Sequence, residues 1–157
     1  MNEIMLSIRP KWCELIASGQ KTIEVRKTKP KCNVPFKVYI YCTKQVVNGE
    51  ILLTYDKKVE GRNKGFRDGG DIPLAGKVIG EFVCDEILDC RDVHIDVTCL
   101  TVEEWLKYTE GHKGSVYGWH ISDLIIYDKP KDLSDFRVKR PPQSWCYVEK
   151  ERESNDE

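Results

Sequence analysis

The pattern of hydrophobic positions changes its period at Gly19, and this change predicts a helix followed by a strand. Over residues 10–18 the apolar side chains recur at i, i+3 and i+4, which is the spacing of one face of an α-helix. Pro10 suits the first helical turn, and Gly19 suits the position just after the last turn. Over residues 21–27 apolar and polar side chains alternate, which is typical of a strand with one buried face.

Further apolar stretches predict the rest of a sheet and a second helix. The predicted strands cover residues 5–8, 36–43, 77–88, 117–127 and 145–148, and residues 93–97 would extend the sheet. Gly80 predicts a bulge or bend in the longest strand. Thr101 and Glu104 form a capping-box pattern that begins the second helix. This order of elements predicts an α+β fold, a mixed, mostly antiparallel β-barrel of about six strands with two flanking helices.

The length of 157 residues predicts a single domain, which we place at residues 1–149. Within it, residues 44–76 form a loop-rich insertion. The Asn-Gly dipeptide inside residues 45–55 predicts a small hairpin, and a glycine-rich stretch follows it. Residues 150–157 are acidic and polar, which predicts a disordered tail.

Composition limits the kinds of partner. The 25 basic and 26 acidic residues give a net charge of -1, so a nucleic-acid site must be a local patch. No apolar run approaches the roughly 20 residues that span a bilayer, and polar residues interrupt the N-terminus where a signal peptide would be apolar. We therefore expect no membrane partner. The seven cysteines are scattered and odd in number, which favours reduced thiols and a cytoplasmic location.

The most informative polar residues lie on the strand predicted at residues 21–27. Glu24 and Arg26 share its polar face, and Lys21 stands where the strand begins. One interpretation is a solvated Glu–Arg pair that contributes little to stability. The other is a polar cleft in which Lys21 and Arg26 bind phosphate or carbonyl oxygens, while Glu24 orients them or moves a proton. The spacing alone does not decide between these interpretations.

Aromatic residues on the next strand also have two interpretations. Tyr39 and Tyr41 lie on the polar face of the strand predicted at residues 36–43. Exposed tyrosine rings on a sheet can stack nucleobases. Alternatively, the two rings cover a neighbouring part of the barrel, and the amphipathic pattern slightly favours this second interpretation.

Residues 19–26, GQKTIEVR, resemble the G-x-K-x-x-E-x-R signature of the ASCH domain family in the PUA-like superfamily of small β-barrels. Residues 6–10, 117–121 and 140–145 resemble other parts of that family in the same order, so the similarity covers roughly residues 4–149. The resemblance implies a PUA-like barrel and a role related to RNA, because PUA-like domains commonly bind RNA. Some ASCH proteins are linked to hydrolysis of acylated cytidine or to RNA cleavage.

The resemblance carries over three site residues directly, and the others are extrapolated from predicted strand ends. The expected ligand-binding residues are Lys21, Glu24, Arg26, Arg9, Tyr41, Trp119, Ser144 and Trp145. For an amide hydrolase, Glu24 would be the base, Lys21 would activate a hydroxyl or water, and Thr22 or Thr43 would be the available hydroxyl.

Metal and histidine chemistry are weaker alternatives. Cys84, Cys90, His94 and Cys99 lack the tight C-x2-C pair of structural zinc sites, so buried apolar cysteines are favoured and no metal or cofactor is expected. His120 lies in a segment shared with the resembled family, and we expect a hydrogen-bonded histidine at the barrel rim rather than a catalytic base.

Three functions remain as hypotheses. The first is binding of RNA or a modified nucleoside in a Lys/Glu/Arg cleft, and the second is hydrolysis of N4-acylated cytidine. The third is a protein-interaction module that uses residues 44–76 as its partner surface. The compact single-domain format suits a bacterial or a phage protein.

Overall fold

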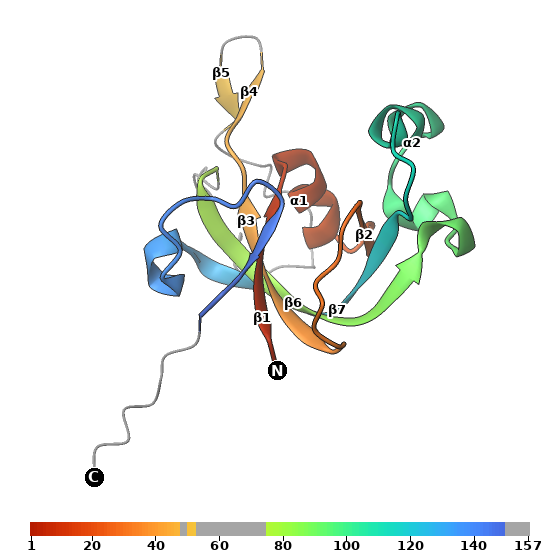
Figure 1. Cartoon of the computed structure of the whole chain (residues 1–157). Helices are drawn as coiled ribbons and strands as arrows, with labels where there is room; N and C mark the ends of the chain where they lie inside the picture. Colours follow the sequence, from red (N-terminus) through yellow and green to blue (C-terminus); the bar gives the residue numbers. More distant parts are fainter. Residues whose placement is uncertain (48–49, 53–74, 150–157) are drawn as a thin grey trace.

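Six strands of the computed structural model form one curled sheet, a half-barrel (Figure 1). The structure describes residues 1–47, 50–52 and 75–149. The sheet consists of β1 (Glu3–Ile8), β2 (Ile23–Arg26), β3 (Phe36–Cys42), β6 (Lys77–Asp89), β7 (Tyr117–Lys131) and β8 (Trp145–Tyr147). Their order is β2-β7-β6-β3-β1-β8, and only β1 and β3 are parallel neighbours among these strands. The expected α+β class and mixed, mostly antiparallel sheet are confirmed.

Within the described residues, two α-helices and three short 3-10 helices connect these strands. They are α1 (Pro10–Ala17), α2 (Val102–Thr109), η2 (Cys90–Asp92), η3 (Ile95–Thr98) and η4 (Leu133–Phe136). Gly19 has a φ of 80° directly after the first helix, and the capping box of Thr101 and Glu104 is present at the second. The helix starts and stops therefore follow local chemistry that the sequence displays.

The strand expected at residues 93–97 is wrong, because this segment contains η3. The His94 side chain accepts a hydrogen bond from the Asp96 backbone N–H, which bends the chain at the point where a strand would stay extended. Cys99 then adopts a left-handed φ of 59° and ends the turn.

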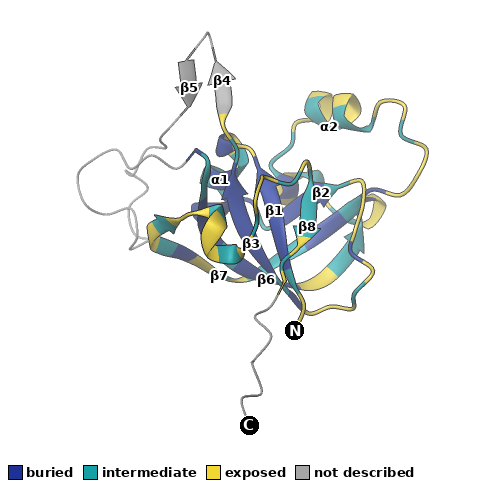
Figure 2. Cartoon of the chain, turned by 60° about the vertical axis from the view of Figure 1, so that its left-hand side comes forward, coloured by how far each residue is buried: buried dark blue, intermediate teal, exposed yellow. Residues whose placement is uncertain are grey.

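The main core lies between the concave face of the sheet and α1. Trp119 is completely buried there, and its ring meets Phe36 edge-on at a centroid distance of 5.6 Å. Figure 2 shows that β1 and β3 are buried along almost their whole length. Both faces of β3 are covered, since a second cluster packs against its other side.

Tyr39 and Tyr41 belong to that second cluster, under Leu133 and Phe136 of η4. The Tyr39 ring lies 4.5 Å from that of Phe136, and its hydroxyl donates to the Glu3 carboxylate at 2.9 Å. The two tyrosines therefore pack against the neighbouring 3-10 helix. This agrees with the interpretation that their rings cover a neighbouring part of the barrel.

The bulge expected at Gly80 is present. The pairing of β6 with β7 shifts register between Val78 and Gly80. A Cβ at Gly80 would lie 2.4 Å from the backbone oxygen of Ile125, so only glycine allows the two strands to approach this closely.

The predictions on the insertion and the tail concern residues that lie largely outside the described part. β4 (Gln45–Val47) and β5 (Glu50–Leu52) pair antiparallel, as the hairpin signal predicts. Residues 48–49, 53–74 and 150–157 are not described, so the domain limits stay a prediction. Among the helices of the described residues, none is long and apolar enough to cross a membrane.

Candidate functional site

A cleft of about 660 Å³ lies where β2 and the ends of β1 and β3 meet the two α-helices. Its lining residues are Ser7, Arg9, Trp12, Lys21, Glu24, Val25, Arg26, Lys27, Thr43, Leu100, Glu104, Lys107, Tyr108 and Gln143. Residues at the start of α1 and on α2 both contribute to this lining. The cleft is therefore assembled from segments that are far apart in the sequence.

Two charged side chains of the cleft are buried. Lys21 is 2% exposed and Glu24 is 5% exposed, although lysine and glutamate are rarely buried without partners. The Lys21 ammonium donates to the Thr98 carbonyl and lies 4.9 Å from the centroid of the Trp12 ring. These contacts fix the lysine against the cleft lining.

Glu24 is only partly satisfied by its surroundings. Its Oε1 lies 3.7 Å from Nε of Arg26, which is an ion pair without a hydrogen bond. Its Oε2 is buried and has no hydrogen-bond partner among the described residues. A buried carboxylate oxygen without a donor costs free energy, so a ligand that brings an N–H group would be favoured here.

Arg26 bridges the two edges of the half-barrel. Its Nη2 donates to the Ser7 carbonyl at 2.6 Å, and its Nη1 donates to the Ser144 hydroxyl at 3.2 Å. β2 is one edge of the sheet, and Ser144 directly precedes β8, the other edge. Arg26 therefore stabilises the opening of the barrel as well as lining the cleft, and its Nε is a second buried atom without a hydrogen-bond partner in the described structure.

The cleft is positively charged in a chain whose net charge is -1. Five cationic side chains line it against two carboxylates. One of those carboxylates, Glu104, is paired with Lys11 at 3.2 Å, and the hydrogen bond from the Thr101 backbone contributes most to lowering its pKa. The local field thus favours an anionic or electron-rich ligand.

The structure brings five of the candidate residues into this cleft, and a sixth adjoins it. Lys21, Glu24, Arg26, Arg9 and Thr43 line the cleft, and Ser144 reaches it through its hydrogen bond with Arg26.

Three aromatic candidates do not line the cleft. Tyr41 lies in the cluster under η4, on the other face of the sheet. Trp119 is the register partner of Glu24, but its ring packs into the core. Trp145 packs edge-on against Trp119 at 6.2 Å and donates to the Thr28 hydroxyl. The binding roles expected for these three rings are not supported by their positions, because core packing already occupies them.

Trp12 and Tyr108 are aromatic residues of the cleft that the sequence reasoning missed as site residues. Trp12 packs against the main core and also lines the cleft. Tyr108 and Glu104 stand four residues apart on α2 and face the cleft together. The sequence did contain a signal for this site, because α2 is rich in polar residues. None of its residues is buried, which is unusual for a helix that covers a core.

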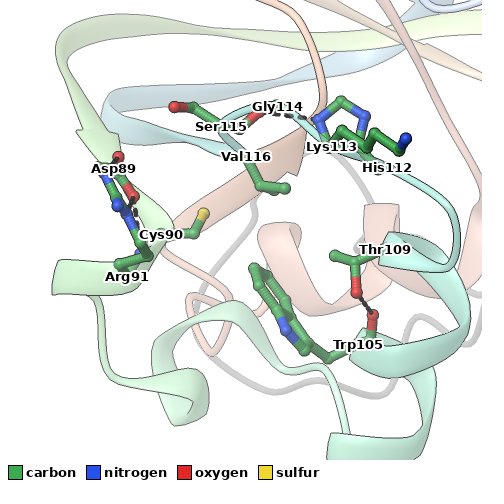
Figure 3. A pocket seen from close by; sticks show the side chains of 10 residues that line it. All are labelled: Asp89, Cys90, Arg91, Trp105, Thr109, His112, Lys113, Gly114, Ser115 and Val116. Carbon is green, nitrogen blue, oxygen red and sulfur yellow. Dashed lines mark hydrogen bonds and ion pairs between the residues drawn. The ribbon is translucent and has the colours of Figure 1, made fainter.

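A second pocket of about 350 Å³ lies between the end of β6, α2 and the segment that precedes β7 (Figure 3). One of its cations, Arg91, is held by two contacts to the Asp89 carboxylate, which keep the pKa of Asp89 at about 2. His112 bonds to the Ser115 carbonyl. Burial raises the pKa of the Cys90 thiol to about 11, so it is neutral at physiological pH. These groups are already paired or inert, and the first cleft is the better candidate site.

His120 lies outside both pockets. Its Nδ1 is 2.6 Å from Oδ1 of Asp85, and this hydrogen bond lowers the pKa of the Asp85 carboxyl. Both side chains are partly exposed, which fits a hydrogen-bonded histidine at the rim. Within the described residues, no group of three or more His, Cys, Asp or Glu side chains is arranged to hold a metal ion.

A family model and solved structures both relate this chain to ASCH proteins. The family model described as ASCH domain matches residues 6–131. A crystal structure of ASCH from Zymomonas mobilis is 22% identical and superposes with a TM-score of 0.67, covering 95% of this chain and 89% of that chain. A tyrosine-to-phenylalanine mutant of the Zymomonas mobilis protein gives 19% identity and a TM-score of 0.66, with 96% and 92% covered. Among curated proteins, none matches the sequence.

Proposed function

Because the chain belongs to the ASCH domain family, whose PUA-like fold is an RNA-binding fold, we propose that its cleft binds a nucleobase of RNA or of a modified nucleoside. One observation carries this proposal. Glu24 lines the cleft together with Lys21 and Arg26, and its buried Oε2 has no hydrogen-bond partner among the described residues. Such a site offers one strong acceptor beside cationic donors.

The proposed contacts follow from the groups of the cleft that can still donate or accept a hydrogen bond. Glu24 accepts a hydrogen bond from an amino or ring N–H group of the base, and Arg26 and Lys21 donate to a carbonyl oxygen. Trp12 or Tyr108 provides an aromatic face, and stacking of one base contributes about 1–3 kcal/mol in comparable sites. A ligand without the N–H group would leave the carboxylate unpaired, which gives selectivity.

Glu24→Gln tests the proposal with the smallest change in shape. It replaces the carboxylate by an amide of equal size, so a charge-assisted hydrogen bond is lost and affinity should fall about 10- to 100-fold. Isothermal titration with cytidine 5′-monophosphate measures the change. The matched control is Glu86→Gln, the same substitution at an exposed position of β6, which should bind as the wild type does.

Lys21→Met keeps most of the unbranched stem of the lysine but removes its charge. If the ammonium contacts the base or a phosphate, this variant also loses affinity, in the same range as Glu24→Gln. The cleft assignment is wrong if Glu24→Gln and Lys21→Met both bind as tightly as Glu86→Gln while all three unfold at wild-type temperature.

A second candidate function is hydrolysis of N4-acylated cytidine, and the position of Thr43 favours it. Thr43 lines the same cleft as Glu24 and Lys21, so residues that carry a hydroxyl, a carboxylate and an ammonium surround one space. The reaction would add water across the amide C–N bond and release cytidine and a carboxylic acid. Incubation with N4-acetylcytidine followed by chromatography tests it. Cytidine should form with the wild type, whereas product no greater than in a Glu24→Ala control excludes this substrate.

The third hypothesis, a protein-interaction module, depends on residues 44–76, which lie mostly outside the described residues. Deleting this segment tests it. Loss of a co-purifying partner with unchanged RNA binding would favour the module.

A further inference from the structure

The chain that leaves the cleft after β2 lies against β8. Lys27 lines the cleft, and the following residues contact the opposite edge strand of the half-barrel. The Trp145 indole N–H donates to the Thr28 hydroxyl at 2.9 Å, and the Lys31 backbone N–H donates to the Tyr147 hydroxyl at 3.1 Å. Residues 27–31 therefore form a continuous path from the cleft along the open side of the barrel.

Three lysines project from this path at alternate positions. Lys27, Lys29 and Lys31 are exposed, while Pro30 between the last two is buried. Within the described part of the chain, none of these lysines forms an ion pair with a carboxylate. The Cα atoms of alternate residues lie at most about 7 Å apart, so the three lysines are closely spaced along the chain and form one row of attachment points.

Aromatic rings accompany the row. The Lys27 ammonium lies 4.6 Å from the Tyr108 ring centroid, and the Lys29 ammonium lies 5.3 Å from that of Tyr117. At the far end Tyr147 is 49% exposed and is supported edge-on by Trp145 at 5.4 Å. A row of cations that ends at an exposed, supported ring matches a partner that carries both regular negative charge and flat bases.

We propose that Lys27, Lys29, Lys31 and Tyr147, together called the lysine seam, bind the strand of a single-stranded RNA whose base occupies the cleft. This inference rests on the proposed function of the cleft and makes it specific, because the ligand is then a strand rather than a free nucleoside. The lysines contact successive phosphates, and a base beyond the cleft stacks on Tyr147. A duplex fits less well, since its bases are paired and stacked and cannot reach the ring.

Removing two lysines tests the phosphate contacts. Fluorescence anisotropy with a labelled ten-nucleotide oligocytidine gives the affinity at several salt concentrations. Each phosphate contact contributes about 0.7 to the slope of log K against log salt for single strands. Lys29→Ala with Lys31→Ala should therefore reduce the slope by about 1.4 and weaken binding about 25-fold at 0.1 M salt.

The matched control removes the same charge elsewhere. Lys113→Ala with Lys129→Ala deletes two exposed lysines outside the seam, and its slope should stay close to that of the wild type. Cytidine 5′-monophosphate is the second control. It should bind the Lys29/Lys31 variant as it binds the wild type, because a monophosphate in the cleft does not reach Lys29 or Lys31.

Two substitutions of Tyr147 distinguish base stacking from structural support of residues 27–31. Tyr147→Phe removes the hydroxyl that accepts from Lys31 but keeps the ring, so it should bind the oligonucleotide like the wild type. Tyr147→Leu removes the ring and should weaken binding about 5- to 100-fold. Equal losses in both variants would overturn the stacking contact.

The outcomes distinguish the seam from the cleft. If the monophosphate binds but the ten-nucleotide RNA binds no more tightly, or if the Lys29/Lys31 variant behaves like its control, the seam is wrong and the cleft proposal stands. If neither ligand binds, the proposed function fails and the seam with it. If a ten-residue polyglutamate binds as tightly as the RNA and equally well to Tyr147→Leu, the partner is an acidic peptide and the RNA assignment is overturned.

Discussion

The effect of Arg26→Ala on stability shows whether Glu24 and Arg26 form a buried pair that holds the cleft together or an ordinary surface ion pair. The substitution removes the hydrogen bonds to the Ser7 carbonyl and the Ser144 hydroxyl, and bonds from charged groups contribute about 1.5–3 kcal/mol each. It also leaves the buried Glu24 carboxylate without its nearest cation, and breaking a buried pair costs about 3–5 kcal/mol. Because these losses overlap, we expect the free energy of unfolding to fall by about 3–5 kcal/mol in all.

Urea unfolding followed by circular dichroism measures this loss, and the midpoint of thermal unfolding should fall by roughly 10 °C for a chain of this size. A double-mutant cycle with Glu24→Gln isolates the pair. Once Arg26 is absent, neutralising Glu24 removes the unpaired charge, so the double variant should be more stable than the sum of the single effects predicts. We expect a coupling energy of about 1–3 kcal/mol.

The control cycle uses Lys37 and Glu81, an ion pair at 3.5 Å whose side chains are 35% and 18% exposed. Its coupling should be below about 1 kcal/mol, as for other partly exposed pairs. If Arg26→Ala costs less than about 1 kcal/mol, or if its coupling to Glu24 equals that of the control, then the pair is an ordinary surface feature and the reasoning is refuted.

Three other predictions follow from packing, capping and titration. Gly80→Ala would force a Cβ against the Ile125 oxygen, and urea unfolding should show a loss of about 1–3 kcal/mol; an unchanged midpoint would mean that the strands separate freely here. Thr101→Ala removes the cap of α2 and should lower the free energy of unfolding by about 1 kcal/mol. In the same assay Thr101→Ser should keep most of the wild-type stability, because serine also caps helices. Burial raises the pKa of Cys90 to about 11, so the unfolded thiol ionises first and the free energy of unfolding should fall as pH rises from about 9 toward 11. The fall should be smaller in Cys90→Ala, and equal falls in both proteins would contradict the assignment.

Features with a local cause were predictable from the sequence. Pro10 and Gly19 bound the first helix, and the pair of Thr101 and Glu104 begins the second, because each acts through the backbone within a few residues. Gly80 marked the bulge for the same reason. Amino-acid type and spacing contain this information without reference to the rest of the chain.

Features with a distant cause were not predictable. The alternation of β3 left the second face open, but η4 comes from much later in the chain and covers Tyr39 and Tyr41. The strand expected at residues 93–97 failed for a local reason instead, because the Asp96 backbone N–H donates to the His94 side chain and this bond competes with extended structure. Propensity alone does not reveal such contacts.

The candidate site was also predictable only in part. The signature residues Lys21, Glu24 and Arg26 lie around one cleft, whereas the burial of Glu24 could not be deduced from its place on a polar strand face. Segments after η3 and the helix carrying Tyr108 cover that edge, and they join β2 only through the tertiary fold. The aromatic part of the site was missed for this reason.

The most direct test of the central claim is a ¹⁵N NMR titration of the protein with the ten-nucleotide oligocytidine. If the cleft holds the base, amide shifts should gather at residues 21–31 and 98–108, with further changes at Thr43 and Tyr147. Shifts that gather instead around residues 89–91 and 112–116, or no shifts at millimolar RNA, would contradict a nucleobase site at Glu24.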